Sequence, residues 1–266
     1  MKSITFTVSK GGVGKSLITA NVGAALAHKK KKVILVEGDP NQPLQKILGI
    51  TFSPDDFKLE DAVKKDTEID KAIYPTNLEN LFLIPSGVSL QSYFEIDPVS
   101  FASKLSNLKT DFMLIDVPFP LGKAAFLSLG ICDYFIPILT EDEFVLCVES
   151  AIDTLRLGKY FLKSTPLGFV LNRIKNTEKF NKEFIKDLEN LLEIPCITKI
   201  KEDEKVSKSY GEAGSKKAFL AYNALQGCDF AKRIDDIATW ILSEQLEFKK
   251  KDAVKLLQEI IRFSKL

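Results

Sequence analysis

The sequence predicts an α/β fold in which a doubly wound, mostly parallel sheet carries helices on both faces, followed by a C-terminal amphipathic helix. The first indication is a glycine-rich loop, residues 10–16, between an apolar strand-like run and an alanine-rich helical run. The second is that short apolar runs alternate with helical patterns along the chain, which is the βαβ arrangement. The third is that most of these runs are continuously apolar, as expected where helices cover both faces of a parallel sheet.

The expected elements follow one another as alternating strands and helices. The apolar runs predicted as strands are Ser3–Ser9, Val33–Glu37, Leu81–Pro85, Phe112–Val117, Tyr134–Leu139, Gly168–Arg173 and Cys196–Ile200. The patterns predicted as helices are Leu17–His28, Pro98–Leu108, Leu121–Gly130, Glu141–Leu162, Lys179–Leu192, Glu204–Ala213 and Ala224–Glu247. The polar region Thr51–Thr76 has no strong core pattern, and we expect it to decorate an edge of the sheet.

The composition excludes several classes of protein. With 266 residues, of which 45% are hydrophobic, the chain can bury the core of one large domain. A net charge of +1 provides no overall attraction to nucleic acid or to an anionic membrane, so such affinity would need a local patch. The N-terminus lacks a signal-peptide pattern and no apolar run is long enough to span a bilayer, so we expect a cytoplasmic location.

Cysteine and histidine contribute little to the predicted chemistry. The cysteines stand too far apart for a C-x-x-C motif and are expected to be reduced, buried thiols: Cys132, Cys147, Cys196 and Cys228. His28 is the only histidine, so a site with several histidine ligands is excluded.

The residues after the first predicted strand have the pattern of a phosphate-binding loop, and they are Lys10, Gly11, Gly12, Val13, Gly14, Lys15, Ser16 and Leu17. Backbone N–H groups at the start of a helix hold phosphate oxygens, Lys15 adds a positive charge, and the Ser16 hydroxyl is a ligand for Mg²⁺. The common pattern G-x-x-x-x-G-K-[ST] is not met, because Ser9 replaces its first glycine and Lys10 precedes Gly11.

With Lys10 before its two glycines, the loop resembles the deviant Walker A motif K-G-G-x-G-K-[ST] of the MinD/ParA family of P-loop ATPases. The resemblance implies a P-loop NTPase that binds ATP and Mg²⁺ and forms a homodimer when ATP is bound. It also implies that Lys10 contacts phosphate across the dimer interface, so that hydrolysis depends on dimerisation. Lys10, Lys15 and Asp39 are then the catalytic residues. Leu17 replaces the second Thr usual in the family, which keeps a backbone N–H for phosphate but removes a hydroxyl.

Acidic residues at the ends of two predicted strands are the candidate ligands of the metal and of the attacking water. Asp116 ends a run that resembles a Walker B strand, and Asp39 belongs to a segment that resembles the family's D-x-D-P pattern. The resemblance places Mg²⁺ on Ser16, Asp39 and Asp116 and places the water beside Asp39. The first acid of the pattern is Glu37 instead of Asp, and its extra methylene is expected to alter the magnesium geometry and the turnover.

The adenine contacts are expected in later loops. Asn172 precedes Arg173 at the end of a predicted strand, and the family's Asn at this place in the chain hydrogen-bonds adenine. Glu202 and Asp203 lie in a segment that resembles the family's I-P-x-D-x-x-V pattern beside the base, with Lys201 in place of the proline.

The end of the chain predicts a basic and amphipathic helix. We expect residues 1–247 to form the ATPase domain and residues 248–266 to form this appended element. The run Lys249–Lys251 precedes a pattern with one broad apolar face and one polar face. MinD-like proteins commonly end in a helix that binds membrane, which implies peripheral attachment at the inner face of the cell membrane through an anionic surface. Packing on the domain or the dimer, or binding of a partner protein, are the alternatives.

The leading hypothesis is a MinD-like ATPase that acts as an ATP-dependent monomer–dimer switch for spatial regulation, such as placement of the cell division site. An unidentified activating or effector protein is the expected partner. A ParA-like DNA-partition ATPase is an alternative, and the net charge makes DNA the less favoured partner. A metal-cluster or metal-insertion ATPase is another alternative, although the cysteines that such relatives carry after the Walker B strand are absent between Val117 and Phe126. A nucleotide-binding adaptor with little hydrolysis is a further alternative, motivated by Glu37.

Overall fold

The computed structural model describes residues 1–7, 10–64, 68–87, 96–118, 123–206, 221–224, 226–243 and 250–264. Within them, nine strands form a sheet in the order β3-β4-β2-β5-β1-β6-β8-β9, with β7 paired to β6. The strands are β1 Lys2–Thr7, β2 Val33–Glu37, β3 Tyr74–Pro75, β4 Leu81–Ile84, β5 Phe112–Asp116, β6 Tyr134–Thr140, β7 Thr165–Pro166, β8 Phe169–Ile174 and β9 Cys196–Lys201. All pairs are parallel except β3 with β4.

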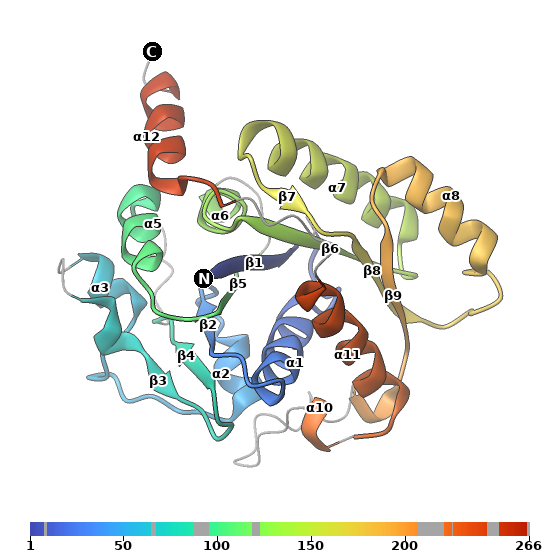
Figure 1. Cartoon of the computed structure of the whole chain (residues 1–266), viewed down its shortest axis with the longest axis horizontal. Helices are drawn as coiled ribbons and strands as arrows, with labels where there is room; N and C mark the ends of the chain where they lie inside the picture. The colour runs from blue at the N-terminus through green and yellow to red at the C-terminus, as the bar shows by residue number, and fades with distance from the viewer. Residues whose placement is uncertain are drawn as a thin grey trace.

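Helices cover both faces of this sheet. Figure 1 shows α1, α2, α10 and α11 on one side and α5, α6, α7 and α8 on the other. The helical elements are α1 Lys15–His28, α2 Pro43–Leu48, α3 Leu59–Lys64, η1 Ile69–Ala72, α5 Pro98–Ser106, α6 Lys123–Ser128, α7 Phe144–Arg156, η2 Leu157–Phe161, α8 Lys182–Leu192, α10 Ala221–Ala224, α11 Asp229–Leu242 and α12 Ala253–Ser264. The predicted doubly wound α/β fold is therefore confirmed.

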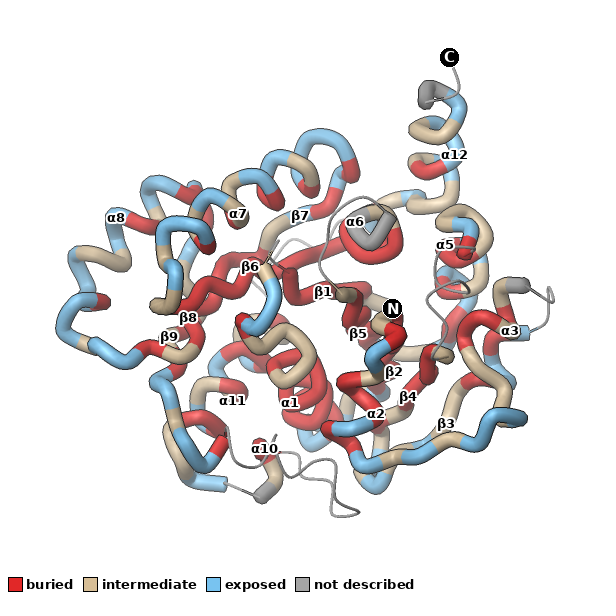
Figure 2. Tube along the Cα trace, turned by 180° about the vertical axis from the view of Figure 1, so that it is seen from behind, coloured by how far each residue is buried: buried red, intermediate tan, exposed pale blue. Residues whose placement is uncertain are grey.

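The central strands are buried from end to end, as the continuous apolar runs predict. Every residue of β2, β5 and β6 is buried, and Figure 2 shows this core enclosed by helices with exposed outer faces. Parallel strands in this position need a layer of helices on each side. Their carboxyl ends meet at one edge of the sheet, which is where a doubly wound fold binds its ligand.

Several predicted helix boundaries are wrong by a few residues. α7 begins only at Phe144, because Glu143 has a left-handed backbone with φ 51°, and the chain then ends this helix in the π-helical turn η2. α8 begins at Lys182, because the Asn181 side chain accepts a hydrogen bond from the N–H of Phe184 and caps the helix. Most of the predicted helix 204–213 lies outside the described residues.

The region predicted to decorate the edge contains α3, η1 and the short strand β3. β3 is the antiparallel edge strand of the sheet, paired to β4. The helix α2, which precedes this region and follows the acidic segment at the end of β2, was not predicted from the sequence.

The C-terminal helix α12 packs against the body of the protein at its N-terminal end, and Figure 1 shows its C-terminal end extending outward beside α5. Leu257 is fully buried in the cluster of apolar side chains shared with α5 and β5. Before the helix, the Lys251 ammonium donates hydrogen bonds to the carbonyls of Leu129 and Leu162 and to the Ser164 hydroxyl. Burial lowers the pKa of Lys251 to about 8. The expected boundary at residues 247 and 248 lies outside the described residues.

In the described residues, no helix is both long enough and apolar enough to cross a membrane.

Candidate functional site

The loop between β1 and α1 has the backbone geometry of a cradle open to solvent. Gly12 and Gly14 adopt positive φ values of 75° and 93°, which favour glycine. Gly14 caps α1 without any side-chain hydrogen bond, so the first N–H groups of the helix remain available for an anion. A Cβ added at Gly11 or Gly12 would meet no atom within 4 Å. The loop therefore presents bare backbone toward a ligand.

β8 holds this loop from the opposite side. The Asn172 side chain donates a hydrogen bond of 2.8 Å to the Val13 carbonyl, and Arg173 donates one of 3.3 Å to the Gly12 carbonyl. A Cβ at Gly14 would lie 2.7 Å from the Asn172 amide nitrogen, so only glycine fits between helix and strand. Within the loop, the Lys15 ammonium donates to the Lys10 carbonyl at 3.0 Å. The cradle is thus positioned by residues more than 150 positions away in the chain.

A pocket of about 470 Å³ opens over the loop and collects most of the predicted site residues. The predicted residues that line it are Gly11, Gly12, Gly14, Lys15, Ser16, Leu17, Asp39, Asn172, Glu202 and Asp203. Three predicted residues do not line it: Val13 is buried beneath the loop, Asp116 is 1% exposed, and Lys10 points to one side. The structure therefore brings the loop, the acid after β2 and the loops after β8 and β9 to one place.

Asp116 is a buried acid that has no hydrogen bond of ordinary geometry among the described residues, although the Ser16 hydroxyl lies close enough to favour its charged form. Both of its carboxylate oxygens lack such a bond within these residues. Burial raises its pKa to about 7, while the nearby Ser16 hydroxyl and Lys15 ammonium lower it by less. Burial also lowers the pKa of Lys15, and the charges of Asp116 and Asp39 oppose that change. An orphaned carboxylate beside a hydroxyl and a second carboxylate is a hard oxygen donor set, which fits Mg²⁺.

Asp39 lies in the loop between β2 and α2. Its side-chain oxygen Oδ1 accepts hydrogen bonds from the backbone N–H of Asn41 at 2.8 Å and from its side-chain amide at 3.0 Å. The second carboxylate oxygen, Oδ2, is left for a ligand in the pocket. Asp39 lines the pocket, and its contact with the attacking water and the metal stays a prediction.

Glu37 does not face the pocket, although the sequence pattern places it among the acids near the metal. Its carboxylate turns toward α2 and accepts hydrogen bonds from the N–H groups of Leu44 and Gln45. Burial, together with the charge of Asp116, raises its pKa to about 8 against the lowering effect of these bonds. The contacts of Glu37 are thus with α2 rather than with the pocket, and an effect of its longer side chain on the metal geometry stays a prediction.

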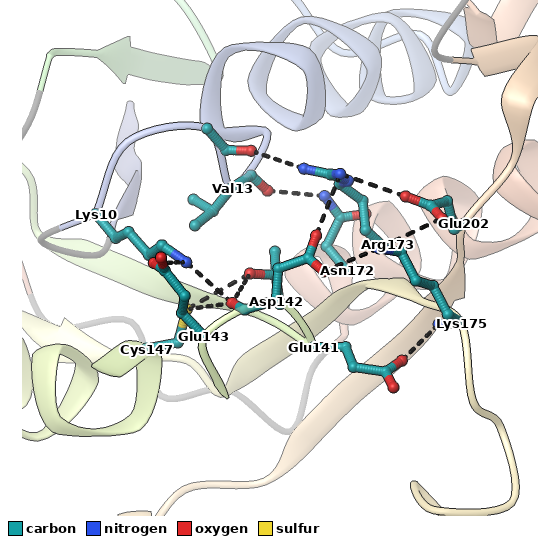
Figure 3. A network of polar contacts seen from close by, with 12 residues as sticks. Lys10, Val13, Glu141, Asp142, Glu143, Cys147, Asn172, Arg173, Lys175 and Glu202 are labelled. Carbon is teal, nitrogen blue, oxygen red and sulfur yellow. Dashed lines mark hydrogen bonds and ion pairs between the residues drawn. The ribbon is translucent and has the colours of Figure 1, made fainter. Parts of the chain in front are cut away.

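Lys10 is held within its own chain by the loop between β6 and α7. Its ammonium forms an ion pair of 2.7 Å with Glu143 and donates to the Asp142 carbonyl at 2.9 Å. Figure 3 shows the loop between β6 and α7 lying between the glycine-rich loop and β8. Arg173 of β8 contacts both the glycine-rich loop and Glu202. Arg173 pairs with both Asp142 and Glu202 at 3.3 Å. Acidic and basic side chains thus alternate along this side of the glycine-rich loop, and two of them, Arg173 and Glu202, line the pocket.

One wall of the pocket is apolar, and two of its residues, Ile200 and Val206, belong to the segment that the sequence analysis expects beside the base, whereas Phe230 was not predicted. Ile200, Val206 and Phe230 line it, and all three are largely buried. Asn172 stands beside this wall, and its oxygen Oδ1 and second amide hydrogen are free of the contact with Val13. An apolar wall with one amide and two acids, Glu202 and Asp203, has the size and character of a site for a planar base. No local pattern marks Phe230, because it reaches the pocket only through the packing of α11.

The remaining motifs lie away from the pocket. Lys29 and Lys30, at the end of α1, form ion pairs with Asp235 and Glu79, and the His28 ring faces Tyr222 and Asn223. Cys132 and Cys147 are buried and the other two cysteines are half-buried. Within the described ranges, no group of three or more His, Cys, Asp or Glu side chains could hold a metal ion.

Comparison with known sequences identifies relatives of the whole chain. The CobQ/CobB/MinD/ParA nucleotide-binding domain matches residues 4–215. An uncharacterized ATP-binding protein of Methanocaldococcus jannaschii is 34% identical over 263 residues, covering 98% of this chain and 95% of the relative. The virulence plasmid ParA family protein pGP5-D of Chlamydia psittaci is 29% identical over 279 residues, covering 98% of this chain and 100% of the relative.

Solved structures show the same fold. The cell division ATPase MinD of Pyrococcus furiosus superposes with a TM-score of 0.76 at 27% identity, covering 91% of this chain and 98% of that one. The septum site-determining protein MinD of Pyrococcus horikoshii, solved with Mg-ADP, gives a TM-score of 0.75 at 25% identity, covering 90% of this chain and 95% of that one.

Proposed function

Because the chain belongs to the CobQ/CobB/MinD/ParA family of nucleotide-binding domains, we propose that it is an Mg²⁺-dependent ATPase that switches between a monomer and an ATP-bound homodimer. The observation that carries the proposal is the orphaned Asp116 carboxylate, buried beside Lys15 and Ser16 at the base of an open glycine cradle. A buried acid in this position is costly unless a cation accompanies it.

Each residue of the pocket has a role in this proposal. The N–H groups at the start of α1 and the Lys15 ammonium bind the phosphates, and Asp39 orients the attacking water. Ser16, Asp39 and Asp116 would hold Mg²⁺, which neutralises charge on the phosphates when it is bound. At the other end of the pocket, Asn172, Glu202 and Asp203 recognise the adenine against the apolar wall.

Lys10 acts across the dimer interface in this proposal. In the isolated chain its ammonium is paired with Glu143, so it must leave this acid before it can reach a phosphate of the partner subunit. A cation that neutralises phosphate charge from a second subunit makes hydrolysis depend on dimerisation, as an arginine finger does.

The test combines turnover with the oligomeric state. We expect Mg²⁺-dependent ATP hydrolysis in the wild type, a dimer with ATP and a monomer with ADP. Asp39→Ala should lower kcat at least 100-fold and retain the ATP dimer, because the water loses its orienting carboxylate. Lys10→Ala should lower kcat and also prevent the ATP dimer, whereas the control Lys30→Ala, at a side chain 78% exposed, should change neither. ATP binding without any effect on the monomer–dimer balance would contradict the switch.

We further propose a MinD-like role in spatial regulation, such as placement of the division site, with a separate activating or effector protein. The support is the similarity to MinD structures and the amphipathic α12. In this role the protein is cytoplasmic and attaches peripherally to the inner face of the membrane through α12. Attachment requires that α12 leave its packed position. Co-sedimentation with anionic vesicles, in ATP against ADP and with a chain ending at Glu247, tests this role. Pelleting must require both ATP and the final helix.

A ParA-like role in DNA partition is the second candidate, because the similarity to a plasmid ParA family protein extends over the whole length of both chains. It predicts that the ATP dimer, rather than the monomer, binds unrelated DNA fragments with an affinity that falls steeply with salt. DNA binding without vesicle binding would select this role over the MinD-like one.

A further inference from the structure

Glu37 is a buried acid whose hydrogen bonds join two elements beside the pocket. Its oxygen Oε1 accepts from the Leu44 N–H at 2.6 Å and from the Gln45 N–H at 3.2 Å, and its Oε2 accepts from the Gln45 side-chain amide at 2.6 Å. Pro43 begins α2 and has no N–H, so these are the first two backbone donors of that helix. One carboxylate therefore ties the start of α2 to the end of β2.

The same contacts continue to the loop that carries Asp39. The Gln45 amide that bonds Glu37 also donates to the Ser86 carbonyl at 3.2 Å, and Gln42 donates to the same carbonyl at 3.0 Å. The Ser86 hydroxyl in turn donates to the backbone carbonyl of Asp39 at 2.8 Å. The loop from Gly38 to Gln42 is thus held by α2 and by Ser86, which lies two residues after β4.

The length of the Glu37 side chain matters to this connection. Glu37 is in register with Asp116 on the neighbouring strand β5, so the two side chains leave the same face of the sheet. Asp116 stays beside Lys15, whereas the extra methylene lets Glu37 reach α2. A side chain one methylene shorter would fall about 1.5 Å short of the N–H groups.

We propose that Glu37 is a positioning residue, which fixes α2 and the connected Ser86 contact so that the loop holds Asp39 in its productive place. This inference rests on the proposed ATPase function. It gives Glu37 a different task from that of an acid facing the metal, because none of its contacts is directed into the pocket.

The experiment compares three variants of the full chain with one control. Glu37→Asp shortens the side chain, so that it no longer reaches the N–H groups at the start of α2. Gln45→Met removes the amide that joins Glu37 to Ser86. Glu37→Gln keeps an oxygen that can accept from the two backbone N–H groups. Asp133→Asn is the control, since Asp133 is also a buried, hydrogen-bonded acid but contacts Ser3 and Lys251 at the other end of the sheet. Hydrogen exchange of the amides of residues 38–48 is measured without nucleotide, and kcat, KM for MgATP and the ATP affinity are measured in parallel.

We expect Glu37→Asp and Gln45→Met to increase amide exchange in residues 38–48 at least tenfold and to lower kcat at least tenfold, with ATP affinity changed less than threefold. Glu37→Gln keeps an acceptor for the two backbone N–H groups but sets its own NH2 against the Gln45 amide, so it should fall between the wild type and Glu37→Asp in each measurement. Asp133→Asn should lower the melting temperature without a selective loss of kcat.

Two results would overturn the inference. A rise in kcat for Glu37→Asp would mean that the position serves the metal, and unchanged exchange in residues 38–48 would mean that Glu37 does not hold the loop. A wild type without any hydrolysis would refute the proposed function instead. In that case, the exchange data alone still decide whether Glu37 fixes the loop.

Discussion

Replacing Asp116 with asparagine should make the nucleotide-free protein more stable while it removes activity. Asp116 is 1% exposed and neither of its oxygens has a hydrogen bond of ordinary geometry among the described residues. An ionised carboxylate in such a place is destabilising, because it has lost its water and gained no equivalent contact. The asparagine side chain has nearly the same shape without the charge, but it could not serve as a metal ligand of equal strength.

The size of the effect follows from the raised pKa of Asp116. A pKa that moves from 3.8 to about 7 corresponds to at most about 4 kcal/mol of lost stability above pH 7. The direction of the change in stability with pH follows from whether Asp116 is protonated in the folded and in the unfolded state. Below pH 3.8 both the folded and the unfolded state are protonated, so there is no penalty. As the pH rises toward 7 only the unfolded state loses its proton, so the penalty grows, and above pH 7 it is complete.

The asparagine amide also has a cost, because its N–H groups are buried without acceptors, at about 1–3 kcal/mol. The net gain from Asp116→Asn should therefore be about 1–3 kcal/mol at pH 8, whereas at pH 5, where the penalty is only about 1.6 kcal/mol, the variant should range from about as stable as the wild type to about 1 kcal/mol less stable. Urea unfolding at both pH values in EDTA measures it, with the same buffer series for wild type and variant. Asp133→Asn is the matched control and should destabilise, because that acid has donors to lose. A variant at position 116 that is less stable than the wild type at pH 8 would refute the reasoning.

Two other substitutions test the loop and the final helix. Gly14→Ala should cost about 2–3 kcal/mol of unfolding free energy and abolish ATP binding in a fluorescent-nucleotide titration, because its Cβ would lie 2.7 Å from the Asn172 amide at φ 93°. Gly11→Ala, with open space around it, should retain the fold and serves as its control. Leu257→Ala should lower stability by about 2–4 kcal/mol in urea unfolding if α12 is packed in solution, and the exposed control Gln258→Ala by less than about 0.5 kcal/mol. Equal values for these two variants would show that the helix is free.

Local patterns correctly predicted the seven longer strands and the glycine-rich loop that joins the first strand to the first helix. The loop is recognisable because glycines, Lys15 and Ser16 must follow a strand and open a helix within a few residues. Buried parallel strands such as β5 are recognisable because both of their faces need apolar side chains. Helix boundaries were less accurate, since a single capping contact such as that of Asn181 decides where a helix begins.

The site shows the limit of the sequence more clearly. Asp39 and Asp116 come together because parallel strands end at one edge, which the βαβ pattern implies. Phe230 could not be predicted, because its place beside the pocket depends on how α11 packs against α1 and β9. The contact of Lys10 with Glu143 likewise depends on a left-handed turn that no motif marks.

The sequence by itself determined the fold class, the glycine-rich loop between β1 and α1 and the strand ends that carry Asp39 and Asp116, because each of these depends on residues close together in the chain or on a simple periodicity. Only the tertiary structure decided where Glu37 points and whether the last helix is packed. Both depend on partners far away in the sequence, such as the contact of Lys251 with the Leu129 carbonyl. Which partner such a side chain contacts depends on the distances between segments that are remote in sequence, and only the folded chain fixes those distances.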